Sequence, residues 1–310
     1  MANENGWGDG ASNNDIGWGK GADNAIGWGA IYADSWSGLT DIVGVSAASL
    51  LLDTYTGAAV AYSLRQLRTA YTGAAIRVRR SSDNAEQDIG FVGNDLDTTS
   101  LLSFVGANNG FIVTWYDQST NANNATQSTV ASQAQIVSSG SLILDADTSK
   151  ITTTWTTDRY TLTTGISTNT QYFSISMWRR GATTTDTMIH LGNSTGNNPC
   201  TLYWLGTGSA YSVRSYMSTL LSYENVSTTG RCIMTSLRDS ANLKVAYRNG
   251  TQLTNTATQA PVAGTLNTFG QVSTSTYTSG QYQELIYWNS EQSANRTAIE
   301  DNINTYWNVY

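Results

Sequence analysis

Apolar residues recur along the chain with two different spacings, one typical of helices and one typical of strands. Over residues 58–70, Val60, Leu64 and Leu67 recur at three- and four-residue spacing, while Arg65 and Arg68 share another side. This spacing is typical of an amphipathic helix. We therefore predict a helix near residues 58–70.

Beyond this segment the period of apolar positions changes to two. Ile76 and Val78 alternate with Arg77 and Arg79, and residues 111–115 alternate in the same way. After about residue 128, apolar runs separated by Gly, Asn, Ser and Thr predict further strands. These runs cover residues 141–147, 171–180, 186–192, 201–206, 211–217, 231–238, 243–253 and 281–288.

Two local signals complete this mainly β pattern. The Asn249-Gly250 pair predicts a hairpin, because both central positions of a type I′ turn need a positive φ. Residues 290–310 predict a last helix with Ser290 or Ser293 as its N-cap and an apolar stripe of Ile299, Ile303 and Tyr306. The fold class we expect is a mainly β antiparallel sandwich with one or two short helices.

The first 40 residues differ from the rest because a short GWG unit occurs three times. It places Trp7, Trp18 and Trp28 at intervals of 11 and 10 residues, and Trp36 follows. Units this short and rich in Gly cannot bury a core alone, so we expect residues 1–40 to dock through these tryptophans on another protein. A disordered leader is the alternative. Residues 41–310 would form the sandwich domain.

Composition and charge exclude some classes of function. Charged residues make up 13% of the chain, the net charge is −7, and only Lys20, Lys150 and Lys244 are lysines, so we expect no nucleic-acid partner. The start has no secretory signal pattern, and no window is apolar enough for a membrane span. Cys200 and Cys232 could form one bridge or remain buried free thiols.

The C-terminal part resembles a known superfamily. The Asn249-Gly250 hairpin is followed by a Gly-rich strand, by Gly280, Tyr282, Glu284, Ile286 and Tyr287, and then by the terminal helix. This order resembles the concanavalin A-like lectin/glucanase superfamily, particularly its laminin-G-like jelly rolls. The resemblance covers roughly residues 128–310 and implies a concanavalin A-like β-sandwich there.

A second resemblance covers residues 51–127. The runs LLDTYTGAAVAYSLRQLRTAYTGAAIRVRRSSDNAEQDIGF and GFIVTWYDQSTNANNATQ are similar to the start of the fungal arabinofuranosidase B catalytic domain. The whole chain is also similar to a group of phage virion proteins with GWG-type leaders. That similarity implies a bacteriophage structural protein, namely a head fibre, spike or tail adhesin.

The phage resemblance carries further expectations. It implies a location in the virion, contacts with capsid, portal or tail proteins, attachment to a host-surface glycan, a homo-oligomer with a trimer favoured, and no enzymatic activity. Two alternatives remain open. In the first alternative, the chain is a glycoside hydrolase of the arabinofuranosidase type. In the second, it is a free carbohydrate-binding module.

A retaining hydrolase would need two carboxyl groups close together. The candidates are Asp83, Glu86, Asp88, Asp117 and Glu284. The resembling enzymes line their sugar site with two adjacent cysteines, which Cys200 and Cys232 are not, and none of the matched motifs carries their catalytic carboxylates. We therefore assign no catalytic residue from the sequence.

Glycan binding and ion pairing are the other candidate roles. Aromatic and polar side chains that suit a glycan are Tyr203, Trp204, Tyr211, Tyr216 and Asp117, although Asp117 also fits a structural role in fixing its turn. We expect structural ion pairs between the predicted helix and the strand at 76–80, or alternatively an anionic-glycan site. The residues concerned are Arg65, Arg68, Arg77, Arg79, Asp83 and Asp88.

The sequence offers little for a metal site. His190 is the one histidine, so a site of several histidines cannot form, and we expect it in the core or at a strand edge. The chain has no Asp-x-Asp-x-Asp-Gly loop. We expect no cofactor, with Ca²⁺ held by loop oxygens as the alternative.

Overall fold

The computed structural model divides the chain into two units, Met1–Ser49 and Leu50–Tyr310. It describes residues 49–310 except 169, 181–186, 195–198, 208–209, 218–219, 226–229, 262, 273 and 275, and it leaves open the side chains of 180, 199–212 and 214–225. The predicted docking residues Trp7, Trp18, Trp28 and Trp36 lie outside the described residues.

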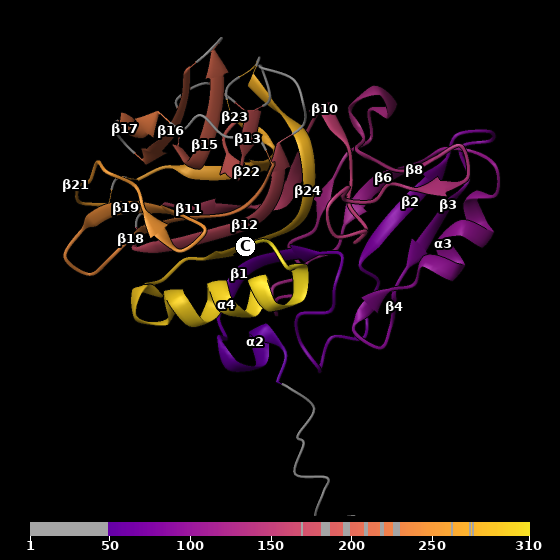
Figure 1. The fold of residues 1–310 in the computed structure, drawn as a ribbon, viewed down its shortest axis with the longest axis horizontal. Coiled ribbons are helices and arrows are strands. Elements are labelled where there is room, and N and C mark those ends of the chain that lie inside the picture. Colours follow the sequence, from indigo (N-terminus) through magenta and orange to yellow (C-terminus); the bar gives the residue numbers. More distant parts are fainter. Residues whose placement is uncertain are drawn as a thin grey trace, which may run out of the picture. The chain divides into compact units, whose positions relative to one another are not determined.

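The first large sheet is built around the long strand β24 (Thr276–Trp288), and Figure 1 shows it crossing the centre of the second unit. Its strand order is β1-β24-β12-β18-β19-β20, with β10 and β23 also on β24 and β21 on β19. The bounds are β1 Ala58–Ser63, β10 Trp155–Asp158, β12 Tyr172–Arg180, β18 Gly230–Arg238, β19 Leu243–Arg248, β20 Thr251–Gln252, β21 Ala257–Thr258 and β23 Gln271–Val272.

A second large sheet has the order β14-β22-β11-β7-β6-β2-β3, with β8 paired to β6 and β9 to β8. Its bounds are β2 Ile76–Arg80, β3 Glu86–Ile89, β6 Gly110–Trp115, β7 Ala125–Thr126, β8 Gln135–Ser138, β9 Ser141–Leu142, β11 Tyr160–Ser167, β14 Leu191–Gly192 and β22 Thr265–Phe269.

Smaller elements complete the second unit. One further sheet runs β13-β15-β16-β17, and β4 pairs with β5. The strand bounds are β4 Phe91–Val92, β5 Asp95–Leu96, β13 Thr187–Ile189, β15 Pro199–Thr207, β16 Ala210–Met217 and β17 Leu220–Asn225. The helices are α2 Leu51–Thr54, α3 Thr98–Val105 and α4 Arg296–Trp307, with 3₁₀ turns η3 Val130–Ser132 and η4 Ser293–Asn295.

The predicted fold class is confirmed. The described residues form antiparallel sheets in a sandwich-like arrangement with few short helices (Figure 1). The predicted hairpin is present between β19 and β20, where Arg248 pairs with Thr251 across Asn249 (φ 49°) and Gly250 (φ 75°). Local turn chemistry is enough to specify this hairpin, since few residues other than Asn and Gly adopt two successive positive φ angles.

The helix predicted at residues 58–70 is wrong, because Ala58–Ser63 forms strand β1 at the edge of the first sheet. The Asp117 carboxylate accepts the Ala61 N–H (2.8 Å), and the Gln118 N–H donates to the Ala61 carbonyl (2.9 Å). The Asn121 amide donates to the carbonyls of Ala58 and Ala59. A distant loop therefore supplies the bonds that a helix would have made internally.

The C-terminal helix is present, but its predicted caps are not. Helix α4 begins after Asn295, which makes no capping bond through its side chain, and the turn η4 holds Ser293. Ile299, Ile303 and Trp307 are buried, whereas Tyr306 is only partly so. The buried stripe therefore ends one residue later than we predicted.

Aromatic side chains join the two large sheets. The Phe269 ring on β22 lies 4.9 Å from that of Trp155 on β10, 5.2 Å from Tyr282 on β24 and 5.6 Å from Tyr62 on β1, measured between ring centroids. All four side chains are buried. This cluster packs β10, β24 and β1 of the first sheet against β22 of the second.

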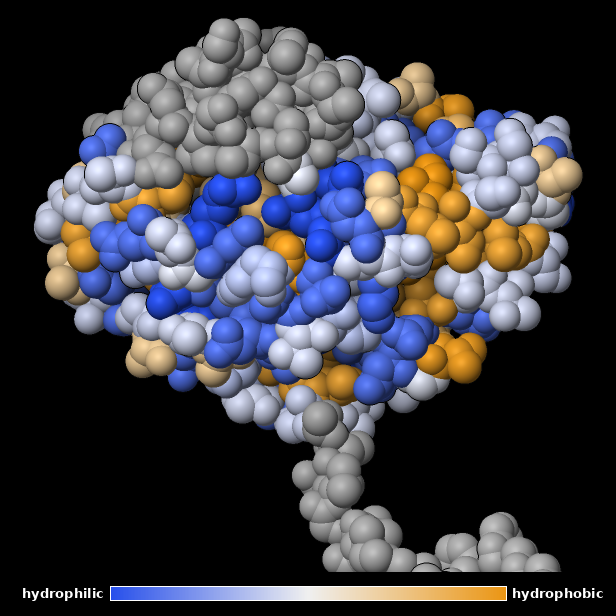
Figure 2. All heavy atoms as spheres, viewed as in Figure 1, coloured by the Kyte–Doolittle hydropathy of each residue, from blue (hydrophilic) through white to orange (hydrophobic). Residues whose placement is uncertain are grey.

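The surface of the second unit is mixed. In the view of Figure 2, polar side chains dominate over α4, and apolar ones gather over the part that holds β2, β3 and α3. Among the described residues, no helix is long and apolar enough to cross a membrane.

Candidate functional site

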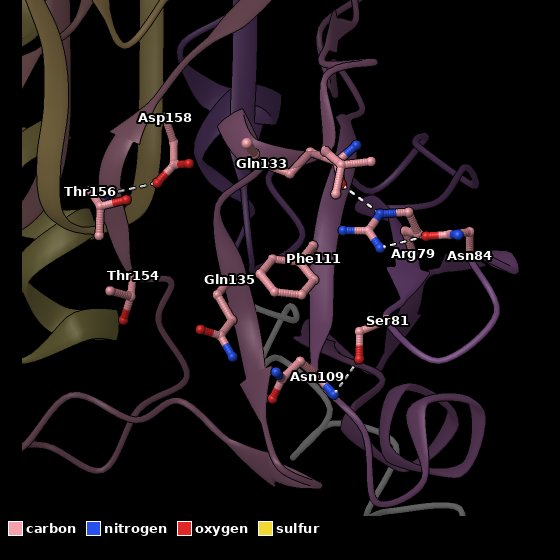
Figure 3. Close-up of a pocket in the computed structure, with 12 residues that line it drawn as sticks. Arg79, Ser81, Asn84, Asn109, Phe111, Gln133, Gln135, Thr154, Thr156 and Asp158 are labelled. Carbon is pink, nitrogen blue, oxygen red and sulfur yellow. Dashed lines mark hydrogen bonds between the residues drawn. The ribbon is translucent and has the colours of Figure 1, made fainter.

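A pocket of about 480 Å³ opens between the β2–β3 turn, β6, β8 and β10 (Figure 3). Its described lining contains one cation, Arg79, and one carboxyl group, Asp158. The rest of the lining is amide, hydroxyl and apolar. This size lies in the range of small-molecule sites, and the lining suits a ligand rich in hydroxyl groups.

Arg79 is held in a fixed orientation on one side of the pocket. Its Nε donates to Gln133 Oε1 (2.8 Å), its Nη1 donates to Asn84 Oδ1 (2.9 Å), and its guanidinium carbon lies 5.0 Å from the Phe111 ring centroid. The side chain is 5% exposed, and burial lowers the pKa of Arg79. No carboxylate of the described residues forms an ion pair with it.

Asp158 lies on the opposite side of the pocket in Figure 3, at the end of β10. One carboxyl oxygen accepts the Thr156 N–H (2.7 Å), and the second has no partner among the described residues. Burial raises the pKa of Asp158 to about 6, although the Thr156 N–H and the charge of Arg159 oppose the shift. At mildly acidic pH this group is therefore a protonated acid that can donate to a ligand.

Hydroxyl and amide groups complete the lining, with Thr154 and Thr156 on the same side as Asp158 (Figure 3). The backbones of Gln135 and Thr154 exchange two hydrogen bonds (3.0 and 2.8 Å), which brings β8 beside the segment leading into β10. The side-chain hydroxyls of Thr154 and Thr156 have no partner among the described residues. Together with Asp158, they offer several groups for the hydroxyls of a sugar.

None of the five carboxylates proposed from the sequence lines this pocket. Glu284 is 1% exposed, and it accepts from Arg65 Nε (2.7 Å) and Trp307 Nε1 (3.0 Å). Asp83 pairs with Arg80 and Asp88 with Arg77, while Glu86 lies beside a second, smaller hollow. These groups are engaged in ion pairs or lie away from the pocket.

Asp117 serves its own loop. Its carboxylate accepts the N–H groups of Ala61, Ser119 and Asn123 at 2.8 to 2.9 Å and the Ser119 hydroxyl at 2.7 Å. Burial raises its pKa, and these hydrogen bonds oppose the rise. With four donors around it and 2% exposure, Asp117 is unavailable to a glycan.

The arginines predicted to form ion pairs differ in their surroundings. Arg77 pairs with Asp88 (2.7 Å) at the surface, and Arg65 pairs with Glu284 (2.7 Å) in the interior. Arg68 donates to the carbonyls of Gln118 and Ser119. Because residues 58–63 form a strand, these pairs do not join a helix to the strand at 76–80.

The four predicted glycan-binding aromatics stand on two neighbouring strands. Tyr203 and Trp204 belong to β15, and Tyr211 and Tyr216 to β16, but their side chains lie outside the described residues. The interpretation of these four residues stays a prediction.

His190 and Cys232 are buried away from the pocket. The two ring nitrogens of His190 bond the hydroxyls of Ser174 (2.8 Å) and Ser176 (2.7 Å), and burial lowers its pKa to about 3. Cys232 is a free thiol, so it does not form the bridge to Cys200 that the sequence left open. Burial raises the pKa of this thiol to about 12. No group of three potential metal ligands occurs among the described side chains.

Sequence reasoning missed Asp158 and the amides of Gln133 and Gln135. Asp158 stands in a Thr-rich run without any motif, and Arg79 looked like one of several paired arginines. No local signal separates these residues from their neighbours. Their importance follows only from the pocket that the fold builds around them.

Comparison with known proteins adds an independent finding. Residues 52–189 match the family model described as the catalytic domain of alpha-L-arabinofuranosidase B, which covers less than half of the chain. This segment contains the pocket lining from Arg79 to Asp158. No curated protein is recognisably similar to the chain in sequence.

Solved structures agree on the fold. An arabinofuranosidase complexed with arabinofuranosyl-alpha-1,2-xylobiose matches with a TM-score of 0.63, 14% identity, and coverage of 82% of this chain and 64% of that one. A mutant GH54 α-L-arabinofuranosidase soaked with 4-nitrophenyl α-L-arabinofuranoside matches with a TM-score of 0.64 at the same identity and coverage. The chain thus spans less than two thirds of these enzymes.

These findings correct the phage interpretation. A virion structural protein without enzymatic activity, located in the virion and bound to other virion proteins, is wrong, because the family model and the matching structures point to glycoside hydrolases. The predicted homotrimer was inferred from the same interpretation as a fibre or spike, and it loses its support together with that interpretation. By fold and by family model, this chain is similar to arabinofuranosidases.

Proposed function

We propose that this chain is a glycoside hydrolase of the arabinofuranosidase type that acts on α-L-arabinofuranosides. The observation that carries the proposal is the match of residues 52–189 to the arabinofuranosidase B catalytic model. The matched segment supplies a pocket with free hydroxyl groups and a carboxyl group of raised pKa, which is the chemistry that glycoside hydrolysis uses.

Asp158 is the candidate general acid of this reaction. A glycosidase protonates the leaving-group oxygen with a carboxylic acid, and burial keeps such an acid protonated near pH 6. The reaction also needs a second carboxylate, as nucleophile or base. No other described lining residue is a carboxylate, so this partner has to come from outside that group.

The test measures turnover of two arabinofuranosides by the purified full chain. 4-Nitrophenol leaves readily without a proton, whereas methanol needs one. We therefore expect Asp158→Asn to lower kcat/KM for methyl α-L-arabinofuranoside by about 100-fold or more, and to affect the 4-nitrophenyl glycoside much less. Asp301→Asn, an exposed change on α4, is the matched control and should alter neither rate.

The outcomes separate the hydrolase from the acid. If the unmodified chain releases neither 4-nitrophenol nor arabinose, the hydrolase proposal is wrong. If it releases both, and Asp158→Asn slows the two substrates equally or not at all, hydrolysis stands and Asp158 is not the acid.

A second candidate function is arabinofuranoside binding without hydrolysis. The specific observation in its favour is that Asp158 is the one carboxyl group in the described lining. In that case methyl α-L-arabinofuranoside should bind saturably, as measured by calorimetric titration, with no arabinose released after prolonged incubation.

A further inference from the structure

The three arginines of β2 differ in how their charge is balanced. Arg77 pairs with Asp88 at 2.7 Å, and Arg80 pairs with Asp83 at 2.6 Å. Arg79, on the same strand, has only the neutral oxygens of Gln133 and Asn84 as partners. Arg79 is the most deeply buried of the three. No described carboxylate forms an ion pair with it, and its cross-strand neighbour Glu86 acts on it only through its charge, which raises the pKa of Arg79 against the effect of burial.

A buried cation with no carboxylate in direct contact is costly, and a negatively charged ligand that contacts it lowers this cost. The two amide oxygens and the Phe111 ring hold the Arg79 guanidinium in place, and Nη2 keeps its N–H groups free toward the pocket (Figure 3). One free guanidinium nitrogen with a single positive charge matches one carboxylate.

The rest of the pocket is suited to a sugar that carries this carboxylate. The hydroxyls of Thr154 and Thr156 and the second oxygen of Asp158 are free on the opposite side. They provide donors and acceptors for ring hydroxyls at a distance from Arg79, across a cavity of about 480 Å³.

We propose that this pocket takes a hexuronic acid, with the sugar carboxylate on Arg79 and its ring hydroxyls on the Thr154, Thr156 and Asp158 side. The inference rests on the proposed function and narrows it. The substrate class becomes an arabinofuranosyl glycan that also carries uronic acid residues.

The test is a calorimetric titration of the full chain at pH 5 with two ligands of the same shape. The methyl glycoside of glucuronic acid carries the negative charge, and the methyl ester of this glycoside lacks it. At this pH the uronate is ionised, whereas Asp158, with its pKa raised to about 6, is mostly protonated and does not repel it. We expect the acid to bind at least tenfold more tightly than the ester.

Variants then assign this preference to Arg79. Arg79→Gln keeps amide donors and removes the charge, so it should abolish the tenfold preference. Arg79→Lys keeps the positive charge but lacks the planar guanidinium, so it should retain part of the preference for the acid. This variant replaces Arg79→Gln in the test if circular dichroism shows that Arg79→Gln folds poorly. Arg77→Gln is the matched control, because the Arg77 charge is already paired and it lies outside this pocket.

Equal affinity for the acid and the ester would overturn the proposal, and so would a preference that survives in a folded Arg79→Gln variant. Neither result bears on hydrolysis, because turnover of neutral methyl α-L-arabinofuranoside is measured separately. Loss of that turnover with a retained uronate preference would contradict the hydrolase and leave the anionic sugar site standing.

Discussion

At the scale of single residues, the pocket is defined by how its two ionisable groups are buried. Arg79 keeps its charge because guanidinium is a very strong base. The neutral side-chain oxygens of Gln133 and Asn84 accept its hydrogen bonds. Asp158 responds differently, since a buried carboxyl group can take up a proton instead. The same degree of burial therefore yields a fixed cation on one side of the pocket and a titratable acid on the other.

The raised pKa of Asp158 makes stability depend on pH. Between its ordinary pKa of 3.8 and the folded value of about 6, the unfolded chain releases the proton while the folded chain retains it. Asp158 therefore lowers the free energy of unfolding as pH rises through this window. We expect Asp158→Asn to raise that free energy by about 3 kcal/mol at pH 8 and to change it much less at pH 4.

Urea denaturation at the two pH values measures this effect, with Asp301→Asn as the exposed control. An equal effect of Asp158→Asn at pH 4 and pH 8 would contradict the assigned pKa shift.

At the scale of elements, a buried ion pair joins β1, β24 and α4. Glu284 on β24 accepts from Arg65 just after β1, from Ser63 Oγ (2.8 Å) on β1 and from Trp307 Nε1 on α4. Glu284 lies outside the pocket lining, and both of its carboxylate oxygens accept hydrogen bonds from these neighbours. Its role is to fix the terminal helix against the sheet edge.

Removing one partner of such a pair leaves an uncompensated buried charge. We expect Glu284→Gln to lower the free energy of unfolding by about 3 kcal/mol, measured by urea denaturation followed by circular dichroism. Asp83→Asn, which breaks the surface pair with Arg80, should have little measurable effect. Similar losses in both variants would show that the interior pair is not the stronger contact.

At the scale of the whole second unit, the two large sheets depend on one aromatic cluster. Phe269 contacts rings from both sheets, including Trp155, Tyr160 and Tyr282. Next to it, Gly270 has φ of 80°, and a Cβ there would lie 2.5 Å from the Trp155 ring. Large rings pack this closely only because the neighbouring residue has no side chain.

We expect Phe269→Ala to lower the free energy of unfolding by about 4 kcal/mol, because it leaves a cavity where the sheets meet. Thermal unfolding followed by tryptophan fluorescence and by far-ultraviolet circular dichroism should keep one common midpoint, shifted downward. Val92→Ala, at a side chain that is 65% exposed, is the control. Separate midpoints from the two probes would mean that the sheets unfold independently.

Local sequence determined much of the architecture. The alternation at residues 76–80 predicted β2, the Asn249-Gly250 pair predicted the β19–β20 turn, and the stripe of Ile299 and Ile303 predicted α4. Each of these signals depends on residues a few positions apart. The resemblance of residues 51–127 to arabinofuranosidase B likewise overlaps, from residue 52 onward, the segment that the family model matches.

Tertiary structure alone decided the rest. Residues 58–63 have a helical spacing, yet they form β1 because Asp117 and Asn121, more than 50 positions away, satisfy the edge of the strand. Arg77 and Arg79 are two positions apart in one motif, but Arg77 forms an ion pair with Asp88, whereas Arg79 lines the larger pocket and forms no ion pair with a described carboxylate. Burial and hydrogen bonding to distant segments determine which residues of a motif remain free for a ligand, and spacing along the chain does not contain that information.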